Sequence, residues 1–387
     1  MRRLATIPVI VDQHAEDAAF LWSRRRREID GPLLGEIDIG RIDQRLDANL
    51  EGLFASGEAA WAAANSRFSD YGEAPELFVM ACLALHWELE KQVAAVVEAA
   101  AALGETGIAA ISGAIARTPR EKLHPFVAKW VDSRETTLKC IGLSALWHHR
   151  VDAGPRLGEL AANGHAEVRI RALWLAGALR RRDLLPLATE RLAADQPRER
   201  LAASLATCLL GAGRMALPVL DELLASANFL PGEIFDIRLL ASAETSAKTW
   251  LQKCLNQPSL RQPALAAIGM LGDRMIAPWL IERMREPQCA FAAGLAWRDL
   301  FDVDFNDTNV FTVDPASLGE QFANIEESPL PSADRANAWW DEGRGPDRHK
   351  AFRSMRKQRL IAIRASFDNP DLPLANWRRT QHFPAWM

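Results

Sequence analysis

The chain of 387 residues is 49% hydrophobic and 25% charged, a balance that excludes disorder throughout and predicts a folded globular protein. Its longest apolar windows, 77–87 and 93–103, fall short of the roughly 20 residues that a membrane-spanning helix needs, and its first residues lack a secretory signal pattern. The net charge of −4 gives no basic field over the whole molecule, which argues against nucleic acid as a partner. We therefore expect a cytoplasmic protein without a transmembrane helix.

The predicted organisation has three parts. Residues 1–72 form a helical cap, residues 73–300 form a helical repeat region, and residues 301–387 form an acidic linker followed by a basic, tryptophan-rich cap. Alanine-rich helices with little room for polar side chains dominate the middle part. The expected fold is therefore all-α, with about six to seven helix pairs stacked between two caps.

The repeat shows itself in the spacing of proline. Prolines stand at 125, 155, 186, 218 and 278, and Lys248 stands at a skipped position, which gives a period of about 31 residues, typical of a solenoid. Because proline suits the first turn of a helix, each of these six anchors is predicted to begin the second helix of a pair. The side chains two and six residues past every anchor are apolar and share one helical face. They are Val127, Leu157, Ala188, Leu220, Trp250 and Leu280, and Val131, Ala161, Leu192, Leu224, Cys254 and Met284.

A charged row is predicted on the opposite face of these second helices. Four residues past the anchors, a helix turns the side chain away from the apolar face, towards the inner surface that second helices line in a solenoid. The residues there are Lys129, Glu159, Glu190, Glu222, Gln252 and Glu282, and those beside them are Trp130, Arg191, Leu223, Lys253 and Arg283. We expect an acidic ridge that binds a basic protein segment, although helix solubility alone would also favour glutamate at such positions.

The C-terminal part combines two opposite charges. Residues 301–345 hold ten acids and two bases, whereas residues 346–387 hold nine bases and three acids. The segment caps the last apolar face of the repeat region, or its basic tail occupies the acidic ridge. The aromatic residues expected in the cap are Trp339, Trp340, Phe352, Trp377 and Trp386. Asp302, Asp304 and Asn306 resemble the start of a calcium loop, but Asp307 and Val313 replace its glycine and glutamate, so a solvated turn is preferred.

Motifs for catalysis are not found in the sequence. The eight histidines form no metal-ligand pattern, and neither a nucleophile elbow nor a phosphate-binding loop is present, so we expect no cofactor and no metal. His148 and His149 are predicted to end a helix. The concave face of a HEAT-like DNA glycosylase could be imitated by Trp130, Trp147 and Trp174 with the arginines at 180–182. Core packing explains the tryptophans better, and a solvated helix end explains the arginines better.

Five cysteines lie far apart within apolar segments, and none belongs to a CxxC pair. Buried free thiols, as in a reducing compartment, are the expected state of all five. They stand at positions 82, 140, 208, 254 and 289.

Two resemblances follow from these segments. The alanine run, LGD turn and proline between Ala264 and Met284 resemble the HEAT repeat in its phycobilisome-lyase-like variety, which implies paired helices. In the flanks, HAEDAAFLWSRRRREIDGP, the helix from Ile39, and the elements AWW, QRLIAI and PLANWRRTQ resemble a proteobacterial HEAT-repeat family of unassigned activity, often encoded near type VI secretion effector genes. The segment 344–353 is shorter and more polar than in that family. The resemblance implies an association with secreted toxins.

The predicted function is therefore non-catalytic protein binding, with a basic secreted effector or toxin as the partner. The chain would act as an immunity protein that neutralises a toxin, or as an adaptor that escorts an effector. An enzyme of the lyase or DNA-glycosylase kind is the alternative, because stacked helix pairs also host enzymes.

Overall fold

The computed structural model describes residues 7–29, 33–34, 36–226, 231–301 and 303–342, together with positions 365, 367, 369 and 371. These residues are predominantly helical and include one pair of very short strands, which confirms the all-α class. The chain divides after Leu179 into two compact units, which hold α1 to α10 and α11 to α19.

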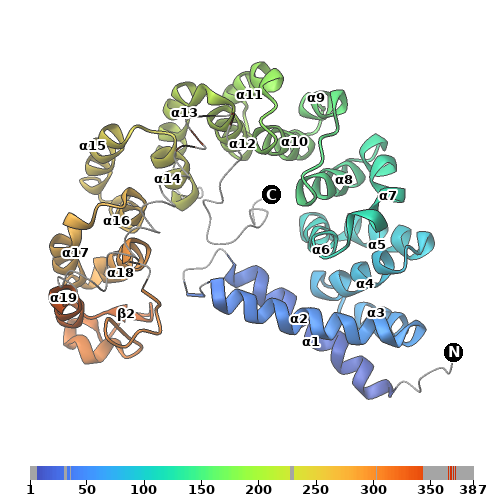
Figure 1. Ribbon diagram of the computed structural model, residues 1–387, viewed down its shortest axis with the longest axis horizontal. Coiled ribbons are helices and arrows are strands. Elements are labelled where there is room, and N and C mark those ends of the chain that lie inside the picture. Colours follow the sequence, from blue (N-terminus) through green and yellow to red (C-terminus); the bar gives the residue numbers. More distant parts are fainter. Residues whose placement is uncertain are drawn as a thin grey trace. The chain divides into compact units, whose positions relative to one another are not determined.

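The first unit is built of two layers of helices (Figure 1). In one layer α4, α6, α8 and α10 pack against one another in succession, and in the other α5, α7 and α9 each pack on the helix that follows. The helices are α1 (Pro8–Glu28), α2 (Glu36–Ser56), α3 (Glu58–Tyr71), α4 (Ala74–His86), α5 (Glu90–Leu103), α6 (Glu105–Ile115), α7 (Arg120–Asp132), α8 (Thr136–His148), α9 (Pro155–Ala161) and α10 (Ala166–Ala178).

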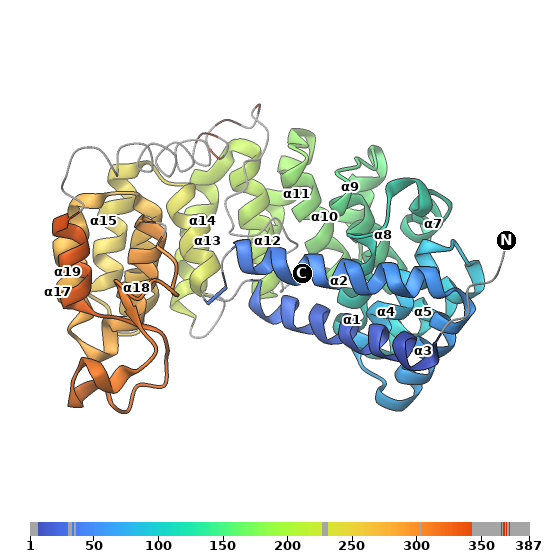
Figure 2. The ribbon, with the colours of Figure 1, turned by 60° about the horizontal axis from the view of Figure 1, so that its bottom comes forward.

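The long helices α1 and α2 lie side by side (Figure 2), and both contact α4, as α3 does. An ion-pair network joins them to the rest of the unit. Asp43 on α2 accepts hydrogen bonds from Arg25 on α1, whose Nη2 lies 3.1 Å from Asp43 Oδ2, and from Arg117 after α6. Arg117 also pairs with Asp47 one turn further along α2. The network therefore links the neighbouring helices α1 and α2 to the segment that follows α6, about 70 residues further along the chain.

The second unit repeats the two-layer packing. In it α12, α13, α14, α16 and α18 pack in succession, α15 packs on α16, and α17 packs on α18. The elements are α11 (Leu185–Glu190), α12 (Pro197–Thr207), α13 (Gly213–Ala225), α14 (Pro231–Leu240), α15 (Glu244–Leu255), α16 (Arg261–Ala267), α17 (Ala277–Met284), α18 (Pro287–Phe301), β1 (Phe311–Thr312), β2 (Leu330–Pro331) and α19 (Ala333–Glu342). Short 3₁₀ turns cover 182–184, 191–193, 268–271, 274–276, 315–318 and 320–322.

One stretch among the described residues, Pro197–Ala225, is apolar and long enough to cross a membrane by length and composition, and 56% of its most apolar window is buried in the protein. It is not one straight helix. A π-helical turn interrupts it at Cys208–Ala212, Gly211 has a φ of 92°, and α12 and α13 on either side pack against each other. A left-handed residue of this kind reverses the chain, so the stretch forms a helical hairpin.

The predicted helix starts are right at three anchors and wrong at the other three. Pro155, Pro186 and Pro278 stand in the first turn of α9, α11 and α17. In contrast, α7 begins at Arg120 and α13 at Gly213, so Pro125 and Pro218 lie inside the helices, and Lys248 lies inside α15. Both internal prolines are exposed, and each removes one backbone hydrogen bond and crowds the carbonyl four residues before it. Their helices nevertheless start about a turn earlier than the proline rule predicts.

The apolar face of the anchored helices is as predicted. Ten of the twelve residues two and six past the anchors are buried, and only Val127 and Trp250 are partly exposed. The five cysteines are free and buried, which confirms that expectation, and burial raises the pKa of Cys208 to about 12. Apolar packing thus fixes which face of each helix points into the unit.

The C-terminal elements cover the last helix of the second unit. Trp339 and Trp340 on α19 contact Trp297, which is fully buried on α18, with ring centroids 5.7 and 6.5 Å apart. Strands β1 and β2 pair antiparallel, with Phe311 opposite Pro331. The two tryptophans therefore pack on the last long helix of the second unit, and the cap over residues 301–387 stays a prediction. Phe352, Trp377, Trp386 and Asp302 lie outside the described residues.

Candidate partner-binding site

The predicted charged row is exposed throughout. The side chains of Glu159, Glu190, Glu222 and Glu282 are between 60% and 64% exposed. Lys129 and Gln252 are exposed as well. The row is therefore accessible to solvent, and its place on an inner surface of a solenoid stays a prediction.

Each glutamate of the row has an arginine beside it. Glu190 pairs with Arg191 at 3.1 Å and Glu282 with Arg285 at 3.7 Å. Arg156 and Arg200 bond to the other two, and Lys129 pairs with Glu90 of α5 at 3.2 Å. Exposed pairs of this kind add little to stability, but they cancel charge locally. The row is therefore a ridge of mixed charge and is less acidic than the glutamates alone suggest.

The residues five past the anchors differ from one another in exposure. Trp130 is 5% exposed and stacks on Phe126 at 5.6 Å, and Leu223 is 1% exposed. Arg191 and Arg283 are partly buried, and Lys253 is exposed. This position lies only about 60° from the buried residue two past the anchor, so apolar side chains turn inward and charged ones reach outward. Trp130 and Leu223 thus belong to the core.

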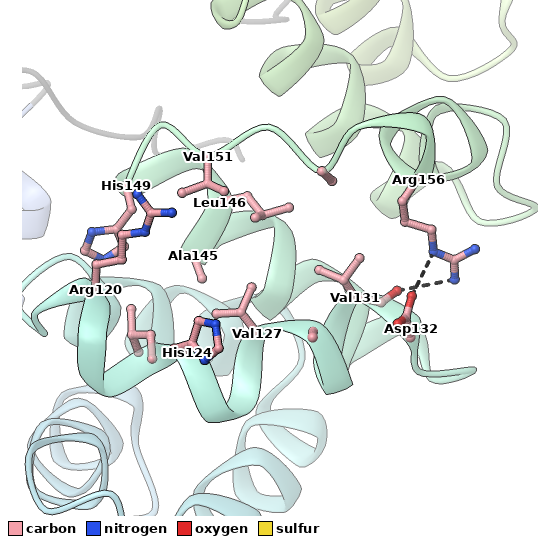
Figure 3. Close-up of a pocket in the computed structure, with 13 residues that line it drawn as sticks. Arg120, His124, Val127, Val131, Asp132, Ala145, Leu146, His149, Val151 and Arg156 are labelled. Carbon is pink, nitrogen blue, oxygen red and sulfur yellow. Dashed lines mark hydrogen bonds and ion pairs between the residues drawn. The ribbon is translucent and has the colours of Figure 1, made fainter.

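A cleft lies on the first unit, lined by residues that the structure describes (Figure 3). Its volume is about 420 Å³, within the range of ligand sites. It lies between α7, α8 and the segment that leads into α9. Apolar side chains form its floor, and they include the partly exposed Val127 and Val151 above the buried Leu123, Val131 and Leu146.

Charged groups occupy the two ends of this cleft. Arg120 and His149 lie together at one end, with His124 next to Val127, and Asp132 and Arg156 lie at the other end (Figure 3). Asp132 Oδ1 is 3.2 Å from Arg156 Nε, so the acid among the lining residues is already neutralised. Arg156 also bonds to Glu159, which connects the charged row to this end of the cleft. At the other end, His149 Nε2 is buried and has no hydrogen-bond partner among the residues that the structure describes.

The cleft stays open because α9 is short. Helix α7 has 13 residues, whereas α9 has only 7 and packs on α10. The connection at 149–154 turns at Arg150 and Gly154, with φ of 51° and 60°, and it places Val151 and Ala153 at the rim. Among the described helices, none therefore covers this face of α7.

The residues weighed for catalysis lie in structural settings. Trp147 and Trp174 are buried and contact each other edge to face at 4.7 Å, which supports their core role. Arg180 donates to Leu209 O at 2.5 Å, and His148 ends α8 as predicted, with its Nε2 3.1 Å from Ser112 Oγ. Asp304 accepts from the backbone and side chain of Asn306, which confirms a turn. Among the described residues no three His, Cys, Asp or Glu are grouped for a metal.

Comparison with known proteins identifies no relative: no family model, no curated protein and no solved structure matches this chain. The candidate site is therefore judged by its own geometry.

The sequence prediction missed the cleft, although its signal is present in α7. Arg120, Leu123, His124, Val127 and Val131 recur at the spacing of one helical stripe, basic at its start and apolar afterwards. The prediction used only positions counted from Pro125, and so it did not identify this stripe. Whether a stripe is covered depends on the length of the neighbouring helix, and α9 has only 7 residues.

Proposed function

We propose that the chain is a non-catalytic protein-binding molecule, built as a HEAT-like solenoid and acting in the cytoplasm. The carrying observation is the α7–α8 cleft, whose apolar floor is open to solvent between groups of fixed charge. Such a site suits the insertion of an apolar side chain from a partner, because burying one releases water from both surfaces. The period of the anchors and the alanine-rich first helices support the solenoid.

The partner class proposed from the sequence resemblance is a type VI secretion effector or toxin. The chain would either neutralise it as an immunity protein or escort it as an adaptor. The charged row supplies a second surface, and its exposed glutamates would attract basic segments of a partner despite the nearby arginines.

The experiment is affinity purification of the tagged chain from cells that express the neighbouring secretion genes, followed by mass spectrometry. A stoichiometric partner should co-purify with the wild type and be lost from Val127→Asp, which places a charge on the cleft floor. The exposed Glu98→Gln on α5 is the control and should retain the partner. If no protein is retained by the wild type, the binding function is wrong, and the enzyme alternative gains weight.

Activity assays on the purified partner distinguish the two roles. An immunity protein should abolish the toxin's activity at equimolar concentration, whereas an adaptor should leave that activity unchanged.

A further inference from the structure

We infer that the α7–α8 cleft binds an acidic segment of a partner protein, one in which an apolar side chain stands next to a carboxylate. This inference rests on the proposed protein-binding function and specifies the chemistry of the partner at this site. It is the opposite of the basic partner expected for the charged row.

The first argument is charge. Of the ionisable residues that line the cleft, Arg120, His124 and His149 lie at or near one end, and Asp132 is held by Arg156 at the other. A carboxylate at the first end would meet a guanidinium able to donate two parallel hydrogen bonds, a geometry that carboxylates match well. A basic segment would meet like charge there.

The second argument is the position of His149. Its side chain lines the cleft beside Arg120 (Figure 3). The imidazole is a polar ring, so it makes this end of the cleft more polar than the aliphatic floor. The polar group of a ligand therefore fits at this end, and its apolar side chain fits on the floor.

The third argument separates protein from nucleic acid. Single strands are held by aromatic side chains on which the bases stack, together with basic groups along the backbone. The floor of this cleft is aliphatic: Val127, Val131, Leu146 and Val151 form it, no Phe, Tyr or Trp lines the cleft, and the aromatic Trp130 of the same helix is buried. An aliphatic floor suits a leucine-like side chain better than a base.

The basic C-terminal segment of the chain itself is a poor occupant. Residues 346–387 carry nine bases and three acids, so like charge opposes their approach to Arg120. A partner segment of opposite charge is favoured instead.

The test measures fluorescence anisotropy of a short labelled peptide in which two leucines alternate with two glutamates, with glycine at each end and an amidated terminus. The full chain should bind it, and versions with lysine for glutamate or serine for leucine should bind at least tenfold more weakly. Arg120→Glu should lower the affinity at least tenfold, and His149→Phe, which keeps a ring but removes the nitrogen, at least threefold.

Arg134→Glu is the matched control, because Arg134 is exposed just beyond the end of α7 and does not line the cleft. It makes the same change of charge and should bind the peptide like the wild type. Circular dichroism should show equal helicity for all variants, since Arg120 is exposed and a glutamate at a helix start is favourable.

Equal binding of the lysine peptide, unchanged binding by Arg120→Glu, or no binding of any peptide would overturn the inference. So would binding of a labelled thymidine octanucleotide that Arg120→Glu abolishes, since that result assigns the site to nucleic acid. A co-purified partner retained equally by Arg120→Glu would also overturn the inference while leaving the proposed function intact. Failure of the wild type to retain any partner tests the proposed function separately.

Discussion

Asp43 shows how single residues tie the first unit together. Burial disfavours its charged form, but hydrogen bonds and charges from Arg25 and Arg117 outweigh this and hold the pKa of Asp43 below its usual value. An acid with a lowered folded-state pKa contributes stability that is complete above the unfolded value of about 4 and is lost as pH falls through the folded value.

Asp43→Asn should therefore lower the free energy of unfolding by about 2 kcal/mol at pH 7, because it leaves two partly buried arginines less well paired. The loss of stability below pH 4 should also become shallower than in the wild type. Urea unfolding at pH 7 and pH 3 would measure both effects. The exposed Glu98→Gln serves as control, and an equal pH response in Asp43→Asn and wild type would contradict the argument.

Arg150 occupies a backbone conformation that favours glycine. Its φ is 51°, and it stands just after α8. At the equivalent place after first helices of the second unit stand two glycines, Gly211 with a φ of 92° and Gly272 with a φ of 68°. A side chain in this region costs about 1 kcal/mol or more, which Arg150 offsets by placing its guanidinium 4.3 Å from the centre of the Trp147 ring.

At this position glycine should be more stabilising than alanine. Arg150→Ala keeps the strain and loses the ring contact, so it should cost about 1 kcal/mol, whereas Arg150→Gly loses the contact but relieves the strain and should be nearly neutral. Thermal unfolding of both variants would measure the difference. Equal stability of the two variants would show that the backbone here is unstrained.

At the scale of elements, small residues set how closely helices pack. A Cβ on Gly107 of α6 would lie 2.5 Å from the backbone oxygen of Ala100 on α5, whereas a Cβ on Gly40 of α2 would meet nothing within 4 Å. Backbone atoms at a helix crossing cannot give way as a flexible side chain can.

Gly107→Ala should therefore destabilise the protein by about 1–3 kcal/mol through overpacking. Gly40→Ala should instead stabilise it by about 0.5–1 kcal/mol, because alanine is the better residue in an open helix interior. Chemical denaturation of the two variants in parallel gives opposite signs if the packing is as described. Stabilisation by both substitutions would mean that α5 and α6 can move apart.

The elements were predictable where a pattern is local, and less so where it depends on a neighbour. The apolar residues around each anchor identified the buried faces. Pro125 and Pro218 misled the prediction of helix starts, because α7 and α13 begin before the proline and continue through it. The burial of Trp130 and Leu223, and the cleft left open by a short α9, depend on tertiary packing that one helix does not encode.

At the scale of the whole molecule, exposed ends of helical layers must be covered. In the second unit Trp339 packs 5.4 Å from Phe301 and 5.7 Å from Trp297, which is fully buried. Removing this ring would uncover an apolar face that a soluble chain has to hide.

Trp339→Ala should cost about 2–3 kcal/mol and increase binding of a hydrophobic dye. Trp279→Ala is the matched control, because that tryptophan is 37% exposed on α17 and its ring lies beside the Arg283 guanidinium at 5.4 Å. The control should change stability by less than about 1 kcal/mol. Equal losses in thermal unfolding would show that α19 is not a cap.

The succession of helices also bears on how the chain is made. Because most helices contact the helix just before or after them, the contacts are local in sequence, and local contacts form quickly. Folding can therefore proceed during synthesis, because each new pair of helices can pack on helices that have already folded. The face of α18 that contacts α19 is the exception, because α19 comes later in the chain. This apolar surface stays exposed on the nascent chain until residues 333–342 have been synthesised. Among the described elements, the last helix to be translated is thus the one that buries it.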